Sequence, residues 1–173
     1  MSGARGRPDN GRRDPPRAHL PLLDRLIDEA PERQQDPPLS PAEAMAALRR
    51  SVRRDMEALL NARRRWRSCP RELGALAVSP LNYGIPDCTG GAFQDVRERE
   101  ALRREIEDTV RRFEPRFRSV RVTLVEGRNK LEATLRLRIE ALLHAEPAPE
   151  PVAFDTLIDV TTADAVVRAH DER

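Results

Sequence analysis

The feature that most constrains the fold is the segment 113–117, Phe-Glu-Pro-Arg-Phe, where one hydrophobic periodicity ends and another begins. Apolar residues recur at helical spacing before this segment, and they alternate as in β-strands after it. Pro115 cannot continue a helix, and it also disfavours the α conformation of Glu114. The segment therefore predicts a corner between a helix and a sheet. Because a carboxylate opposes the dipole at a helix C-terminus, we expect a cation beside Glu114, and Arg116 is the nearest candidate.

Two main helices are predicted before the corner. Ser40, Pro41 and Glu43 are typical of a helix start with a capping box, and this helix should end near Asn61. The second helix should run from about residue 96 to residue 113. Each carries an apolar stripe on one face, made by Met45, Leu48, Val52, Met56 and Leu59 in the first helix and by Leu102, Ile106, Val110 and Phe113 in the second.

Three strands are predicted after the corner, at residues 120–125, 131–141 and 152–160, because apolar and polar residues alternate there. A turn at residues 127–130 should join the first two strands into an antiparallel hairpin. We therefore predict an α+β domain in which two main helices pack on one face of a small antiparallel β-meander. At least one edge strand should be open to pairing, with 131–141 and 152–160 as the candidates.

The rest of the chain divides by composition. Residues 1–19 hold five arginines and two aspartates among glycines and prolines, which predicts a flexible, disordered basic leader. Residues 20–39 should form a short helix and a Pro-rich linker, and that helix would dock either on the domain or on a partner. We assign residues 40–162 to the domain and residues 163–173 to a C-terminal tail.

Composition and spacing argue against several functional classes. No apolar stretch approaches the roughly 20 residues of a membrane helix, and no apolar region follows the basic N-terminus as in a secretory signal. We therefore expect a cytoplasmic chain without membrane insertion. Cys69 and Cys88 lack metal-binding spacing, and the phosphate-binding pattern G-x-x-x-x-G-K-[ST] is absent. No cofactor and no metal are expected.

The region 49–67 is strongly basic, with eight arginines against Asp55 and Glu57. It could be a solvated helix face, a protein contact anchored by arginine, or a nucleic-acid surface. No helix-turn-helix pattern, aromatic RNA-binding motif or zinc spacing accompanies it, so nucleic acid is the least favoured partner.

Catalysis is not favoured by the arrangement of ionisable residues. Glu114 with Asp155 or Asp159 could supply two carboxylates for glycoside hydrolysis, but nothing in their spacing couples them. His19, His144 and His170 lie outside any nucleophile pattern such as G-x-S-x-G. We expect a protein that is not an enzyme, with Glu114 acting as the ion-pair partner of Arg116.

Four segments occur in an order that points to one family: Leu-Leu-Asp-Arg-Leu at 22–26, Ser-Val-Arg-Arg-Asp-Met-Glu-Ala-Leu-Leu-Asn at 51–61, Ser-Pro-Leu-Asn-Tyr-Gly-Ile-Pro-Asp at 79–87, and the corner. Over residues 20–162 the chain resembles the TssE family, the gene-25-like baseplate wedge subunits of bacterial type VI secretion systems. These are related to the wedge protein of contractile phage tails. The family's Glu-Pro-Arg signature is matched by Glu114, Pro115 and Arg116. Phe117 and Ala62 stand where the family usually has leucine and threonine.

The resemblance implies a structural part in the bacterial cytoplasm, in the baseplate at the inner face of the inner membrane. Its expected partners are the wedge proteins TssF and TssG, with TssK as a further candidate, and the sheath proteins TssB and TssC, joined by strand addition. The residues expected to make assembly contacts are Glu114, Pro115, Arg116, Arg53, Arg54, Asn61, Arg63, Asn82, Tyr83 and Gly84. Two alternatives are a nucleic-acid-binding adaptor using the arginines of 49–67 and a peptidoglycan hydrolase, since relatives have been labelled lysozyme-like.

Overall fold

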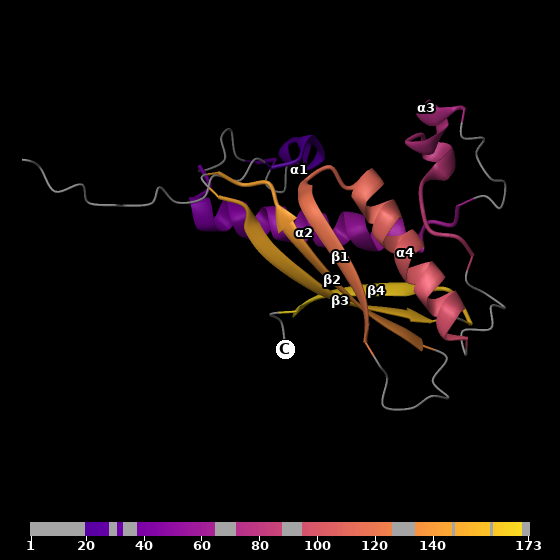
Figure 1. Cartoon of the computed structure of the whole chain (residues 1–173). Coiled ribbons are helices and arrows are strands. Elements are labelled where there is room, and N and C mark those ends of the chain that lie inside the picture. The colour runs from indigo at the N-terminus through magenta and orange to yellow at the C-terminus, as the bar shows by residue number, and fades with distance from the viewer. Residues whose placement is uncertain are drawn as a thin grey trace, which may run out of the picture.

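The chain is an α+β domain, as predicted, and its two long helices cover one four-stranded antiparallel sheet (Figure 1). The computed structural model describes residues 20–27, 31–32, 38–64, 72–87, 95–125, 134–146, 148–159 and 161–170. The helices are α1 (Leu22–Leu26), α2 (Pro41–Asn61), α3 (Gly74–Ala77), the 3-10 turn η1 (Pro80–Asn82) and α4 (Val96–Phe113). The strands are β1 (Phe117–Val125), β2 (Thr134–Leu143), β3 (Glu150–Asp159) and β4 (Ala165–Ala169).

Local capping fixes where the two long helices begin. The Ser40 side chain accepts the N–H of Glu43 at 3.3 Å, and the Glu43 carboxylate accepts the N–H of Ser40 at 2.8 Å. This is the predicted capping box, and it satisfies backbone donors that have no partner within the helix. Asp95 caps α4 by accepting the N–H of Arg97 at 2.8 Å. Both helices are confirmed with the predicted ends.

The sheet contains a strand that the sequence analysis missed. We expected residues 163–173 to be a tail, but β4 pairs antiparallel with β3, with Ala165 opposite Ile158 and Ala169 opposite Phe154. The turn before it is closed by the Asp159 carboxylate, which accepts the N–H of Thr161 at 2.7 Å. Ala165 and Val167 are buried, so β4 belongs to the core.

The strand order β1-β2-β3-β4 also corrects the expected edges. The two strands proposed as open edges, 131–141 and 152–160, correspond to β2 and β3, and both are interior because each pairs on two sides. The edges are β1 and β4. The predicted turn at 127–130 lies outside the described residues, as do the leader 1–19, Cys69 and Cys88.

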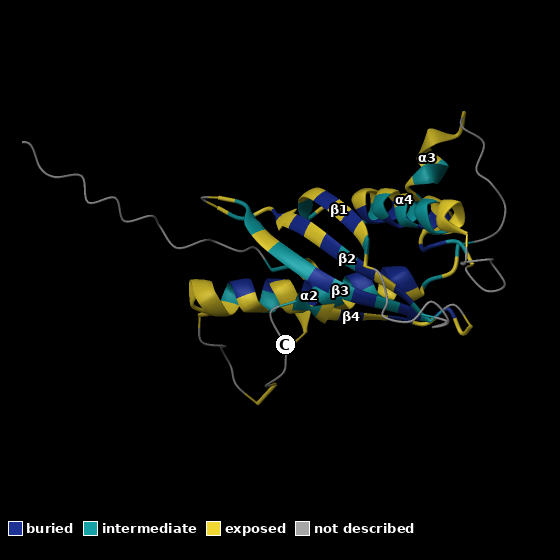
Figure 2. Ribbon diagram, turned by 60° about the horizontal axis from the view of Figure 1, so that its bottom comes forward, coloured by how far each residue is buried: buried dark blue, intermediate teal, exposed yellow. Residues whose placement is uncertain are grey.

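One hydrophobic core joins the buried stripes of α2 and α4 to the inward face of the sheet. Burial alternates along the strands (Figure 2), as expected for a sheet with one covered face. Between the two layers lie the fully buried side chains of Met56, Ile106 and Ile139. α4 lies nearest to β1 and α2 nearest to β4.

Candidate assembly surfaces

The predicted corner forms at the C-terminus of α4. Glu114 is the C-cap residue, and its side chain is almost fully buried, with 5% of its surface exposed. Its carboxylate accepts the backbone N–H of Arg116 at 3.2 Å and the Nε–H of the same residue at 2.6 Å, and it also accepts from Nη2. The ion pair between Glu114 and Arg116 is therefore present. Pro115 places the two residues on either side of the turn.

Arg116 also joins the corner to α2, which the sequence analysis did not predict. Its Nη1 donates to Ser51 Oγ at 3.1 Å, and its Nη2 donates to Asp55 Oδ2 at 2.8 Å. Burial lowers the pKa of Arg116, but the carboxylates of Glu114 and Asp55 outweigh burial and raise that pKa above its usual value. One guanidinium thus fixes the end of α4 against the middle of α2.

The ionic contacts continue from the corner to α1. Arg54 donates to Asp55 at 3.0 Å and to Asp24 of α1 at 2.7 Å. The hydrogen bond from Arg54 holds the pKa of Asp24 below its usual value. Apolar residues of α1 remain largely exposed, with Leu22 at 68% and Leu26 at 72%. The short helix therefore docks on α2 through charged contacts and keeps its apolar side chains exposed.

Beside the ion pair the surface is hollowed over about 460 Å³. We call this the corner hollow. Its apolar and aromatic walls are Pro21, Leu59, Tyr83, Phe113 and Pro115, and its charged walls are Asp55, Glu114 and Arg116. The rings of Tyr83 and Phe113 meet edge to face, with centroids 5.4 Å apart. Burial raises the pKa of Tyr83, and the negative charges of Asp55 and Glu114 raise it further.

Tyr83 reaches the hollow because the segment around Gly84 packs against the end of α2. Gly84 has a φ of +102°, and a Cβ at this position would lie 2.3 Å from the carbonyl oxygen of Ala62. The next residue donates its N–H to that same oxygen at 3.1 Å. Asn82 is buried, and its side-chain amide donates to the carbonyl of Leu76 at 2.7 Å. Three predicted site residues, 82–84, thus act together to position one aromatic wall.

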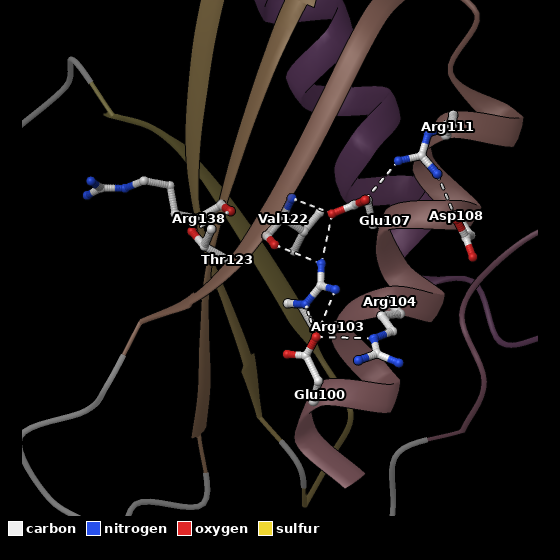
Figure 3. A network of polar contacts seen from close by, with 9 residues as sticks. All are labelled: Glu100, Arg103, Arg104, Glu107, Asp108, Arg111, Val122, Thr123 and Arg138. Atoms are coloured by element: carbon white, nitrogen blue, oxygen red, sulfur yellow. Dashed lines mark hydrogen bonds and ion pairs between the residues drawn. The ribbon is translucent and has the colours of Figure 1, made fainter. Parts of the chain in front are cut away.

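A second feature lies at the β1 edge of the sheet (Figure 3). Glu107 of α4 accepts the backbone N–H of Val122 at 3.0 Å, and Arg103 donates to the carbonyl of the same residue at 3.0 Å. The two side chains also pair with each other at 2.8 Å. They take the place that a neighbouring strand would occupy, so α4 closes the middle of this edge.

The β4 edge carries a similar contact from α2. The side-chain amide of Asn61 accepts the N–H of Ala165 at 2.8 Å and donates to its carbonyl at 2.9 Å. Because backbone groups alternate sides along an antiparallel strand, those of Val167 and Ala169 also point away from β3. Asn61, one of the residues expected to make assembly contacts, thus lies at the β4 edge of the sheet.

The remaining predicted site residues do not join the corner hollow. Arg63 donates to the carbonyl of Leu60 at 3.0 Å, where it satisfies a free acceptor at the end of α2. Arg53 is half-buried on α2, and its side chain makes no hydrogen bond or ion pair with the residues that the structure describes.

Much of the arginine-rich region is committed to contacts within the chain. Arg49 pairs with Glu150 of β3, and Arg64 pairs with Glu105 of α4 at 2.6 Å. With Arg54 bound to Asp24 and Asp55, these charges hold elements together. Arg65 and Arg67 fall outside the described part of the chain.

The carboxylates considered for catalysis lie apart. Glu114 lines the corner hollow, whereas Asp155 lines a different hollow over the strands and contacts Arg138 at 3.2 Å and His170 at 3.0 Å. Among the described residues, no group of three or more His, Cys, Asp or Glu side chains could hold a metal ion. In that same part of the chain, no helix is long and apolar enough to cross a membrane.

Comparison with protein-family models gives a match. The family model described as baseplate wedge protein gp25 matches residues 46–148, which span the corner, α4 and the first two strands. No curated protein and no solved structure matches the chain.

Proposed function

The chain belongs to the baseplate wedge family of gp25, and on this premise we propose that it is a TssE-type subunit of a bacterial type VI secretion baseplate. Its role is that of a structural component of a baseplate of the phage-tail type. In our proposal it works in the bacterial cytoplasm, at the inner face of the inner membrane. It binds the wedge proteins TssF and TssG, with TssK as a further candidate, and connects them to the first TssB–TssC sheath ring.

The observation that carries the wedge contact is the corner itself. Buried Glu114 and half-buried Arg116 form a paired joint between α4 and α2, and beside that joint lies an open hollow with aromatic walls. Arginine and aromatic side chains in a concave surface are typical of interface centres. The corner therefore supplies a rigid, preformed surface for another baseplate protein.

The sheath contact is proposed at the β4 edge. The middle of the β1 edge is occupied by Glu107 and Arg103, whereas on β4 Asn61 binds the backbone of Ala165 at the start of the strand. The backbone groups of Val167 and Ala169 point away from β3, so a sheath strand could add there.

The other functional classes find less support. A nucleic-acid adaptor would need free arginines, but Arg49, Arg54 and Arg64 are paired with carboxylates. A hydrolase would need a carboxyl that a substrate can reach, but the Glu114 carboxylate is buried and accepts from three donor groups of Arg116.

The test is co-purification from cells that express the chain with tagged wedge and sheath proteins. Arg116→Ala removes the contacts to Glu114 and Asp55 and should abolish recovery of TssF and TssG. Exposed Asp108→Ala serves as the control and should leave recovery unchanged. Normal recovery with a folded Arg116→Ala chain would refute the corner as the wedge contact.

A second variant in the same experiment addresses the sheath. Ala169→Pro removes an N–H that points away from β3, so the pairing of β3 with β4 keeps its hydrogen bonds. We expect the wedge proteins to be recovered and the sheath proteins to be lost. Recovery of sheath proteins at the unmodified level would exclude β4 as the edge that accepts a strand.

A further inference from the structure

We propose that the corner hollow receives a cationic side chain, an arginine or a lysine, carried by a partner protein. The inference rests on the proposed function, because it specifies the chemistry of the partner that docks at the corner. It is carried by the charge and the aromatic walls of the hollow and by the apolar segment that follows Pro21.

The connected ionic groups at the corner carry an excess of negative charge. Three carboxylates, those of Asp24, Asp55 and Glu114, are linked by two guanidinium groups, those of Arg54 and Arg116. The sum is one negative charge. The carboxylate of Asp55 remains reachable, because 37% of its side chain is exposed, whereas only 5% of the Glu114 side chain is exposed. An incoming cation would balance this excess, and an incoming carboxylate would be repelled.

The walls suit the body of a long basic side chain. Tyr83 and Phe113 present aromatic rings on one side of the hollow, and Leu59 and Pro115 add apolar surface. Cations are attracted to aromatic rings, and the methylene stems of lysine and arginine pack on apolar walls. Burial raises the pKa of Tyr83, and the negative charges of Asp55 and Glu114 raise it further, as expected beside two carboxylates.

The segment that follows Pro21 exposes apolar surface that would exclude water around the cation. Pro21 lines the hollow, and the residues after it expose apolar side chains: Leu22, Leu23, Leu26 and Ile27. A charged contact surrounded by apolar contacts is the usual arrangement of an interface hot spot. The partner segment should therefore carry one basic residue among apolar ones.

The test is an NMR titration of the full chain with Nα-acetyl-arginine methylamide. The neutral isostere Nα-acetyl-citrulline methylamide is the matched control, because it has the same shape without the charge. We expect the arginine probe to shift the ring signals of Tyr83 and Phe113 and the Nε signal of Arg116. The citrulline probe should bind at least about fivefold more weakly, which corresponds to roughly 1 kcal/mol.

Variants separate the hollow from general surface charge. Asp55→Asn should weaken binding of the arginine probe by a similar factor. Asp108→Asn makes the same charge change at an exposed position on α4 and should leave binding unchanged. Tyr83→Leu replaces Asp55→Asn if that variant fails to fold. Equal shifts with both probes, or no shift of the Tyr83 signals at about 50 mM probe, where roughly millimolar binding would be evident, would overturn the proposal.

The titration contains no wedge protein, so its outcome is independent of the proposed function. If the arginine probe does not bind but the unmodified chain recovers TssF and TssG, the proposal of a cationic side chain in the hollow is rejected and the proposed function stands. If the probe binds but TssF and TssG are not recovered, the proposed partners are rejected, and the corner hollow is still a site for a basic side chain.

Discussion

Gly84 shows how much one residue determines at the corner. Its positive φ is open to glycine at little cost, and an added Cβ would collide with the Ala62 carbonyl at 2.3 Å. We predict that Gly84→Ala lowers the free energy of unfolding by on the order of 2 kcal/mol or more, because the segment must move away from α2. Urea unfolding measures the change. The movement should also displace Tyr83 from Phe113.

Gly74→Ala is the matched control for this substitution. Gly74 begins α3, and a Cβ there meets no atom within 4 Å. Alanine is favoured in helices, so the change should be neutral or stabilising by up to about 1 kcal/mol. If the two variants unfold at the same urea concentration, the close approach of residue 84 to Ala62 does not contribute to stability.

The ion pair at the corner could be predicted from the sequence only in part. Glu114 and Arg116 are two residues apart, so the helix end and the proline were enough to bring them together. The contacts of Arg116 with Ser51 and Asp55 link residues more than 60 positions apart. No local pattern encodes such a distance, so these partners became evident only once α2 was placed against α4.

At the scale of elements, helices were predictable and edges were not. The start of α2 is defined by Ser40 and Glu43, and the end of α4 by Pro115. Each of these signals acts on backbone within one helical turn of itself. Which strand lies at an edge depends on the order of pairing across the whole sheet. β4 is only five residues long, and the turn begun by Asp159 was the one local signal that could have revealed it.

Side chains from the nearest helix hold both edges of the sheet. Substitution of Glu107 tests how much such a contact contributes to stability. We predict that Glu107→Ala lowers the free energy of unfolding by about 1–3 kcal/mol, because the Val122 N–H and Arg103 lose a charged acceptor. Asp108→Ala removes a neighbouring carboxylate that contacts exposed Arg111, and it should cost less than about 0.5 kcal/mol. Equal losses in urea unfolding would mean that the contact with β1 adds nothing.

The Glu107 effect should depend on pH. Burial alone would raise the pKa of Glu107, but the hydrogen bonds from Val122, Arg111 and Arg103 outweigh it and lower the pKa. A carboxyl with a lowered folded-state pKa stabilises the fold fully above its unfolded pKa of about 4.3 and loses this contribution as the pH falls. The difference between wild type and Glu107→Ala should therefore shrink in acid and be constant near neutral pH.

At the scale of the whole molecule, the last strand, β4, packs against the first long helix, α2. Asn61 at the end of α2 binds Ala165 at the start of β4, 104 residues later. Ala165 and Val167 are buried in the same core as Met56 and Leu60, and Ala163 is buried as well. The domain is therefore incomplete at residue 162, where we had expected its boundary.

A chain ending at residue 162 tests this boundary against one ending at residue 170. The shorter chain loses the buried side chains of residues 163–167, worth roughly 4 kcal/mol, a large share of the stability of an ordinary domain. It also leaves the backbone of β3 unpaired along one side, which favours association between chains. We expect the chain ending at 170 to unfold cooperatively as a monomer, and the chain ending at 162 to aggregate or lack a cooperative transition. Size-exclusion chromatography and thermal unfolding distinguish the two. A monomeric, cooperative 1–162 chain would show that β4 is dispensable for the fold and would restore the tail interpretation.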